Sequence, residues 1–257
     1  MCQNVFMAPA KRTKQMDFYV YVDTVVFTIN PDRAVAARDR LEVLVMQRPE
    51  RSSNKWALPG GLVGDTEKLE ETAIRKVSEE TGIALKQRDL HQVGAYGHPD
   101  RDDRFRAIAI AYMALVPHPG DIQPRQHSDK AAFIPYRRLR DKRMLEFDHS
   151  DIIYEARKTA RRMLEDTSVA LSFCKSKFTI SELRSVYEAF LQYEVDPANF
   201  RRKVDAVKNF VTPIDEFADF GTQPGRPAQM YKASSQTASR LSTPIRFRRP
   251  GHPYLEK

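Results

Sequence analysis

Apolar residues in the first two thirds of the chain gather in short runs that favour β-strands. The run FYVYVDTVVF at 18–27 is rich in β-branched and aromatic residues, and LEVLVMQ at 41–47 has the same character. Farther along, apolar residues recur with helical spacing and predict a helix over 69–80, which Thr81-Gly82 ends because glycine readily takes the left-handed conformation there. The expected strands are 18–27, 41–47, 93–96 and 107–116.

A second helix is predicted over 150–164. Asp148 or Ser150 can cap its start, and basic residues lie on the side away from its apolar stripe. We place a domain boundary after this helix, between residues 166 and 176. The stripe consists of Ile152, Ile153, Ala156, Ala160 and Met163.

The pattern changes to a pair of helices after the boundary. Thr179 or Ser181 can start one helix, and Asp196-Pro197 starts the next, with the aspartate as cap and the proline in the first helical position. A turn followed by a strand is expected over 221–232. The apolar faces are Ile180, Leu183, Val186, Tyr187, Phe190 and Leu191 on the first helix, and Phe200, Val204, Val207 and Phe210 on the second.

These elements predict four segments of the chain and an α+β class. Residues 1–16 form a flexible N-terminal arm, 17–166 a first domain, and 167–233 a smaller second domain. Residues 234–257 are rich in Ser, Thr, Pro and Arg and have little apolar periodicity. We expect them to form a basic, flexible tail.

Composition and charge narrow the function only slightly. The chain has 257 residues and a net charge of +8. Residues 166–257 carry 14 Lys+Arg and 10 Asp+Glu, so they have a charge of +4, and residues 1–165 have the remaining +4. The total charge therefore locates no nucleic-acid-binding region. No apolar run approaches the ~20 residues that span a bilayer, and the N-terminus lacks the apolar core of a secretory signal. The two cysteines, Cys2 and Cys174, cannot build a disulfide framework. We expect a reduced, cytoplasmic location and no membrane partner.

The most specific motif begins at Gly61. Residues 61–83, GLVGDTEKLEETAIRKVSEETGI, fit the spacing G-x5-E-x7-R-x-U-x-E-E-x-G-U, in which U is an aliphatic residue. On a helix, positions 76, 79 and 80 lie close together, whereas Ala73 and Val77 face the sheet. The matching residues are Gly61, Glu67, Arg75, Val77, Glu79, Glu80, Gly82 and Ile83.

This loop, helix and loop resemble the motif of the Nudix family. The resemblance implies a Nudix fold, an α/β/α sandwich, in which three glutamates bind Mg²⁺ or Mn²⁺, and the metal polarises a diphosphate and activates water. The chain departs from the family at one position, where Lys76 stands in place of a metal-ligand glutamate. A protonated lysine has no lone pair for a metal and can pair with Glu80 instead.

Two interpretations of Lys76 follow. In one, the motif is a degenerate binding pocket without catalytic residues, and no cofactor is required. In the other, Glu67, Glu79 and Glu80 still hold Mg²⁺ or Mn²⁺, and hydrolysis persists. We favour the first, because a lost ligand and an added positive charge both disfavour the cation.

The charged loop after the motif carries information about the ligand. Residues 97–104, GHPDRDDR, resemble the matching segment of ADP-ribose-directed Nudix proteins, and their arginines can donate charge-assisted hydrogen bonds to phosphate or ribose groups. A surface loop that neutralises its own charge is the alternative. The segment KWALPGG at 55–61 resembles the entry to the same pocket. The expected ligand-binding residues are Lys55, Trp56, Gly61, Arg75, Asp100, Arg101, Arg104 and Arg106.

The second domain has the element order of a winged helix-turn-helix. The buried stripe of its second helix places Arg202, Ala206 and Asn209 on the opposite side. Arginine and asparagine read guanine and adenine edges in the major groove, and the segment PGRP at 224–227 is the candidate wing. The expected DNA-binding residues are Asn199, Arg201, Arg202, Lys203, Asn209, Gly225 and Arg226.

The two parts together resemble one family, the Nudix-related transcriptional regulators. The resemblance covers about residues 18–232 and rests on FDH at 147–149, FTISEL at 178–183, NFRRK at 199–203 and GRPA at 225–228. It implies a homodimeric bacterial repressor of NAD-biosynthesis genes that binds a palindromic double-stranded DNA operator and responds to ADP-ribose or a related nucleotide. The alternative is a metal-dependent Nudix hydrolase, an ADP-ribose pyrophosphatase, whose second domain serves dimerisation or RNA contact. A third interpretation combines repression with residual hydrolysis.

Overall fold

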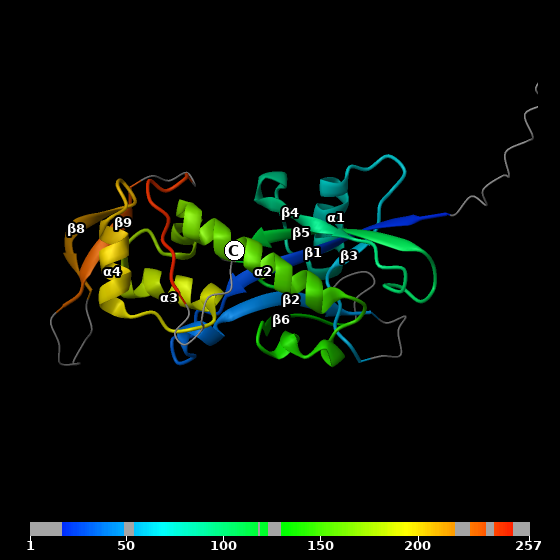
Figure 1. Cartoon of the computed structure of the whole chain (residues 1–257), viewed down its shortest axis with the longest axis horizontal. Helices are drawn as coiled ribbons and strands as arrows, with labels where there is room; N and C mark the ends of the chain where they lie inside the picture. Colours follow the sequence, from blue (N-terminus) through cyan, green and yellow to red (C-terminus); the bar gives the residue numbers. More distant parts are fainter. Residues whose placement is uncertain are drawn as a thin grey trace, which may run out of the picture.

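Figure 1 shows the fold as a computed structural model. The structure describes residues 17–48, 54–117, 119–122, 130–218, 227–234 and 239–248. The predicted N-terminal arm, Cys2 and the predicted wing residues Gly225 and Arg226 lie outside the described residues. Within the described part of the chain, no helix is long and apolar enough to cross a membrane.

The first domain is built on a mixed sheet of six strands. The strand order is β4-β5-β1-β2-β6, and β3 pairs with β1 beside this path. Strand β1 runs parallel to β5 and antiparallel to β2, so the sheet combines a crossover connection with hairpin-type neighbours. The strands are β1 (Tyr19–Ile29), β2 (Leu41–Gln47), β3 (Gly60–Leu62), β4 (Leu90–Tyr96), β5 (Ala107–Leu115) and β6 (Lys130–Pro135).

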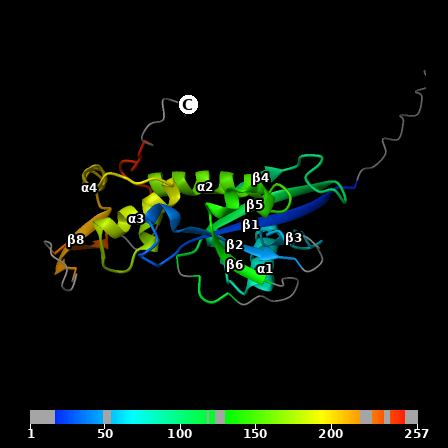
Figure 2. The same ribbon diagram turned by 90° about the horizontal axis from the view of Figure 1, so that it is seen from below.

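Two helices cover the two faces of this sheet, α1 (Leu69–Thr81) on one side and α2 (His149–Asp166) on the other (Figure 2). Ala73 and Val77 of α1 are fully buried, as their spacing predicts. Gly82 ends α1 with a φ of 77°, a conformation that glycine adopts without a steric penalty. The predicted strands and both helices are confirmed close to their expected bounds, whereas β3 and β6 were not predicted. Short 3-10 helices connect the elements: η1 (Ala37–Asp39), η2 (Gln87–Asp89), η3 (Arg138–Arg140) and η4 (Lys142–Met144).

The second domain joins two helices to a three-stranded sheet of order β7-β9-β8. The predicted helix starts are confirmed: Thr179 Oγ1 accepts a hydrogen bond from the backbone N–H of Glu182, and Asp196 Oδ1 accepts one from that of Asn199. The elements are η5 (Ser168–Phe173), β7 (Phe178–Thr179), α3 (Ile180–Leu191), α4 (Pro197–Asp205), β8 (Val211–Phe217) and β9 (Gln229–Ala233).

The prediction for the second helix of this domain is wrong at its C-terminal end. Helix α4 stops at Asp205, and Asn209 lies in the following turn with a φ of 55°. Val207 and Phe210 are buried as predicted, but they belong to the turn that leads into β8. Asn209 therefore does not share the outer face of α4 with Arg202. The turn follows from tertiary packing, which overrides the helical spacing of the apolar residues.

The prediction of a flexible tail is wrong for residues 239–248. Leu241, Ile245 and Phe247 are buried, and the backbone N–H of Ile245 donates to the carbonyl of Glu165 at 2.8 Å. The residues between them are exposed, as in an extended segment that packs along one side. So short a run carries too few apolar residues to stand out from a polar background.

The two domains share one hydrophobic core. The ring of Phe27 in β1 lies 6.0 Å from that of Phe190 in α3, centroid to centroid, and Arg157 of α2 donates to the Phe190 carbonyl at 2.6 Å. Arg38 of η1 pairs with Glu194, just beyond α3, at 2.8 Å. Helix α2 packs on the sheet of the first domain and also contacts α3 of the second domain (Figure 1).

Candidate functional site

Two acidic residues of the Nudix-type motif, Glu67 and Glu79, form salt bridges with Arg75 of the same motif. Arg75 lies between Glu67 and Glu79, with its Nη1 3.1 Å from Glu79 Oε2 and its Nη2 2.6 Å from Glu67 Oε2. The hydrogen bonds from Arg75 and Thr72 lower the pKa of Glu67 to about 2. Two of the three predicted metal ligands are therefore bonded to an arginine.

Lys76 adds a second positive charge to the same group. Its ammonium lies 3.3 Å from Glu79 Oε2, and only 18% of the side chain is exposed. A Cβ atom at Gly61 would lie 2.5 Å from Cε of Lys76, a distance that side chains do not tolerate. The absence of a side chain at Gly61 therefore leaves the space in which Lys76 lies.

Glu80 faces into the protein. It is 3% exposed and accepts a hydrogen bond from the backbone N–H of Gly60 at 3.0 Å. Burial raises its pKa to about 7, against the opposing charges of Arg48 and Lys76. Its carboxylate thus fastens α1 to β3 and is costly to ionise.

All three of these carboxylates have bonding partners within the protein. Glu67 and Glu79 hold Arg75, whereas Glu80 is buried against Gly60. Among the described residues, no group of three or more His, Cys, Asp or Glu side chains is arranged to hold a metal ion. Magnesium and manganese prefer several oxygen ligands at one point, so a metal here would compete with Arg75 for Glu67 and Glu79.

Arg101 of the charged loop is an internal residue. Its Nη2 lies 3.1 Å from Asp23 Oδ2 and 2.8 Å from Asp148 Oδ1, and 4% of its side chain is exposed. Asp148 occupies the cap position of α2, but its carboxylate bonds Arg101 and makes no cap hydrogen bond to the helix. Arg101 thereby ties the loop to the first turn of α2.

Asp23 connects this pair to a buried histidine. His149 Nε2 lies 3.7 Å from Asp23 Oδ2, and its Nδ1 accepts a hydrogen bond from the backbone N–H of Leu58 at 3.0 Å. Burial opposes the charge on Asp23, but His149 and Arg101 outweigh it and hold the pKa of the carboxyl below its ordinary value. Sequence reasoning missed Asp23 because its partners come from distant segments.

The other predicted ligand residues of the loop lie on its outer side. Arg104 donates to both oxygens of Asp102, at 2.9 and 2.8 Å, and its guanidinium lies 4.8 Å from the centre of the Phe105 ring. Arg106 donates to the carbonyl of His98 at 3.1 Å, and its guanidinium lies 5.4 Å from the centre of the Phe18 ring. The pairing within the loop agrees in part with the self-neutralising alternative.

A cavity of about 640 Å³ lies where this loop meets the start of α2. Asp100 and Arg101, two predicted ligand residues, line it. Lys55 is exposed elsewhere, and Trp56 packs against the core while its backbone bonds the segment 144–146. The rest of the wall consists of Ala95, Tyr96, Gly97, His98, Lys142, Phe147, Asp148, Ser150 and Asp151.

On α4, the structure separates the predicted DNA-binding residues into an outward pair and two flanking residues. Arg202 is exposed and donates to Asn199 Oδ1 at 2.8 Å. Arg201 instead bonds Asp205 and the hydroxyl of Tyr231 in β9, at 3.1 and 2.6 Å. The Lys203 ammonium lies 5.6 Å from the centre of the Phe247 ring. Asn199, which is half-buried, and the exposed Arg202 thus bond each other, whereas Arg201, also exposed, bonds Asp205 and Tyr231.

Comparisons with known families assign both domains. The model of the NUDIX domain matches residues 26–156, and that of the NrtR DNA-binding winged helix domain matches residues 170–233. The chain is 28% identical over 239 residues to the ADPR responsive transcriptional repressor NtrR of Acinetobacter baylyi, which covers 91% of this chain and 89% of that protein.

Two further relatives match different lengths of the chain. The crystal structure of Shewanella oneidensis NrtR in complex with a 27mer DNA superposes with a TM-score of 0.64 at 25% identity, over 88% of this chain and 99% of that one. An ADP-ribose pyrophosphatase of Methanocaldococcus jannaschii is 32% identical over 119 residues, or 46% of this chain and 67% of that enzyme. The likeness to the DNA-bound NrtR thus extends over most of this chain, and the likeness to the enzyme extends over less than half of it.

Proposed function

The chain belongs to the NUDIX domain family and carries an NrtR-type winged helix after that domain, and from this premise we propose that it is a DNA-binding transcriptional repressor. Its Nudix domain senses ADP-ribose or a related nucleotide; the similar repressor of Acinetobacter baylyi is named for its response to ADPR. It acts in the cytoplasm as a homodimer on a palindromic operator of NAD-metabolism genes. Two-fold symmetry in the protein requires a matching symmetry in the DNA.

The observation that carries the proposal is the outward pair on α4. Arg202 is exposed, and its hydrogen bond to Asn199 holds both side chains before any DNA arrives. Pre-ordered side chains lose less conformational entropy on binding. Because arginine pairs with guanine and asparagine with adenine in the major groove, the pair favours a base-reading role.

The cavity at the start of α2 supports the sensing part of the proposal. Its volume of about 640 Å³ is in the range of ligand sites, and its wall contains both the loop 97–101 and the first turn of α2. The same helix contacts α3 in the second domain, which we call the reader domain because it carries α4; the first domain is called the sensor domain. A nucleotide that binds there and shifts α2 would alter the reader domain, and the coupling free energy between the two sites is the quantity to measure.

The test begins with DNA selection. The full chain would enrich duplexes from a random-sequence pool, and the enriched duplex would be compared with a scrambled one at several salt concentrations. We expect an inverted repeat that binds about 10³-fold or more tightly than the scrambled duplex. Failure to enrich any sequence at low salt would remove the DNA-reading function.

ADP-ribose would then be titrated into the complex of the chain with its enriched duplex. We expect release of the DNA as the nucleotide saturates the Nudix domain. If calorimetry shows ADP-ribose bound while the complex persists, the nucleotide is not the signal. The DNA-reading function would survive that result.

We also propose that the Nudix domain hydrolyses its ligand poorly or not at all and needs no metal cofactor. Support comes from the lysine at position 76, whose ammonium lies 3.3 Å from Glu79. A hydrolase, alone or combined with repression, is the second candidate, favoured by the retained Glu67, Glu79 and Glu80 and by the likeness to an ADP-ribose pyrophosphatase. That enzyme would use Mg²⁺ or Mn²⁺.

Lys76→Glu separates these candidates. We expect negligible ADP-ribose hydrolysis by the parent chain with either metal, and a measurable gain in the variant, because a third carboxylate replaces the ammonium. Lys68→Glu is the matched control, since it makes the same charge change at a side-chain position that is 75% exposed. Rapid hydrolysis by the parent chain would establish the enzyme and overturn the degenerate pocket.

A further inference from the structure

The segment 239–248, which we call the strap, crosses the junction between α2 and the reader domain (Figure 1). We propose that the strap positions the DNA-reading helix α4, with Phe247 as the positioning residue. The inference rests on the proposed function, because it assigns a role in DNA reading to a segment that contains no residue of the reading pair.

The strap is fastened to the C-terminal end of α2. The backbone N–H groups of Leu241 and Ile245 donate to the carbonyls of Asp166 and Glu165, at 2.9 and 2.8 Å. Arg246 Nη2 lies 2.9 Å from Asp166 Oδ1. These bonds use helix carbonyls that would otherwise lack an intrahelical partner, so the strap also completes the end of α2.

The other end of the contact is α4. The Phe247 ring stacks on Phe200 of α4 with centroids 5.5 Å apart and planes at 17°, and it meets Tyr187 of α3 edge-on at 6.2 Å. Lys203, the next α4 residue on that side, places its ammonium 5.6 Å from the centre of the same ring. Phe247 is 5% exposed, so it is packed like a core residue although it lies outside the predicted second domain.

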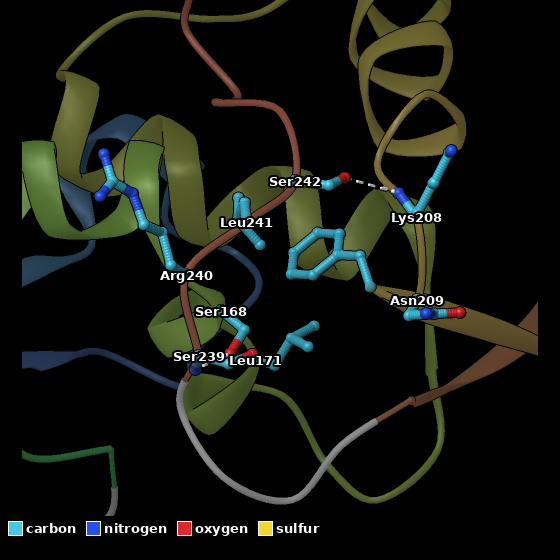
Figure 3. A pocket seen from close by; sticks show the side chains of 9 residues that line it. Ser168, Leu171, Lys208, Asn209, Ser239, Arg240, Leu241 and Ser242 are labelled. Atoms are coloured by element: carbon cyan, nitrogen blue, oxygen red, sulfur yellow. Dashed lines mark hydrogen bonds between the residues drawn. The ribbon is translucent and has the colours of Figure 1, made fainter.

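A second contact holds the turn after α4. The backbone N–H of Lys208 donates to Ser242 Oγ at 3.0 Å, and the strap closes one side of a cavity of about 380 Å³ between this turn and η5 (Figure 3). The strap therefore contacts α4 near its middle and just past its end. With only nine residues in α4, such contacts outside the helix have a large share in fixing its orientation.

The chemical consequence concerns the reading pair. Phe200 and Arg202 belong to the same short helix, so a shift of Phe200 displaces the side chains that meet the bases. If loss of the Phe247 ring lowers the population of the reading-competent orientation to a tenth, DNA affinity falls about ten-fold. ADP-ribose binding should not change, because its proposed cavity lies at the other end of α2.

The experiment compares three variants of the full chain. Phe247→Ala removes the stack, Phe247→Tyr keeps the ring, and Phe173→Ala is a matched control whose ring packs on Phe190 of α3. Affinity for the enriched and scrambled duplexes, ADP-ribose affinity, melting temperature, and hydrogen exchange of residues 197–205 would be measured.

We expect Phe247→Ala to lose about ten-fold in affinity for the enriched duplex and to exchange faster in α4, with Phe247→Tyr near the parent chain and ADP-ribose affinity unchanged. Phe173→Ala should be less stable but should keep its DNA affinity and its exchange in α4. Unchanged exchange and affinity in folded Phe247→Ala, or an equal loss in Phe173→Ala, would overturn the strap's role. If the parent chain selects no DNA while Phe247→Ala still loosens α4, the proposed function fails and the positioning contact stands.

Discussion

Helices α1 and α4 each carry basic residues that the sequence marks as functional, and the environments of these residues differ. On α1 of the sensor domain, Arg75 and Lys76 are turned onto Glu67 and Glu79 and are partly buried. On α4 of the reader domain, Arg202 is exposed and its bonded partner is the neutral Asn199.

The difference concerns the field that each helix presents to a ligand. The charge of a guanidinium bonded to carboxylates is largely cancelled by theirs in the potential that reaches solvent, whereas a neutral amide partner cancels none of it. The sensor helix has therefore satisfied its own charges, and the reader helix retains an attraction for an anion such as DNA. Three substitutions compare the two domains that contain these helices. They are taken from the largest expected effect to the smallest.

Asp23→Asn tests whether the sensor domain depends on internal ion pairing. The change leaves Arg101 buried with one carboxylate fewer, so we expect a loss of about 3 kcal/mol in the free energy of unfolding at pH 7. Because the folded-state pKa of Asp23 is lowered, its stabilisation is complete above its ordinary pKa of 3.8 and is lost as the pH falls through the folded value. The gap between parent and variant should therefore narrow below about pH 4.

Urea denaturation at pH 7 and at pH 3 measures this gap. Asp65→Asn is the control, since it removes the charge of an exposed aspartate and should leave stability within about 0.5 kcal/mol of the parent. A gap of equal size at both pH values would show that the carboxylate charge of Asp23 is not the source of the stability.

Arg202→Ala tests the outward charge of the reader domain. Loss of a base-reading arginine costs about 1–3 kcal/mol, so we expect affinity for the enriched duplex to fall roughly ten- to a hundred-fold and sequence preference to relax. Arg88→Ala removes the same charge from an exposed position in the sensor domain and should leave the affinity nearly unchanged. Equal losses in the two variants would mean that net charge, and not base contact, drives the binding.

Thr179→Ala has the smallest expected effect and asks whether the reader domain depends on local capping. Thr179 Oγ1 accepts from the N–H of Glu182, and the Glu182 carboxylate accepts from the N–H of Thr179, so the change should cost about 1 kcal/mol. Ser185→Ala is the control: it removes a half-buried hydroxyl from the middle of the same helix, where it donates to the carbonyl of Ser181 and caps nothing. Thermal unfolding of both variants gives the comparison, and an unchanged melting temperature for Thr179→Ala would contradict the capping role.

Local features of the sequence predicted much of the fold. Helix α1 and its glycine stop, the cap at Thr179, and the Asp196-Pro197 start of α4 were all predicted correctly, because each depends on residues within one or two turns. The predictions for the end of α4 and for the tail failed, because packing of Phe210 and Phe247 against distant elements decides both.

The candidate site divides along the same line. The spacing of Glu67, Arg75, Glu79 and Glu80 is a property of the sequence, and so is the lysine between them. The bonding partners of those side chains depend on the fold, which places the backbone N–H of Gly60 beside the Glu80 carboxylate. Arg101 shows the limit most clearly: its loop suggested a ligand contact, and only the fold pairs it with Asp23 and Asp148 in the wall of the cavity.

By itself the sequence determined the two families of domain, the position of the departure at Lys76 and the helix that carries Asn199 and Arg202, because motif spacing and helical periodicity are local. Only the tertiary structure decided that the sensor's charges are internally paired, that α2 connects the cavity to the reader domain, and that the strap packs on α4. Those contacts join residues far apart in the chain, and their energies exist only once the fold has brought the partners together.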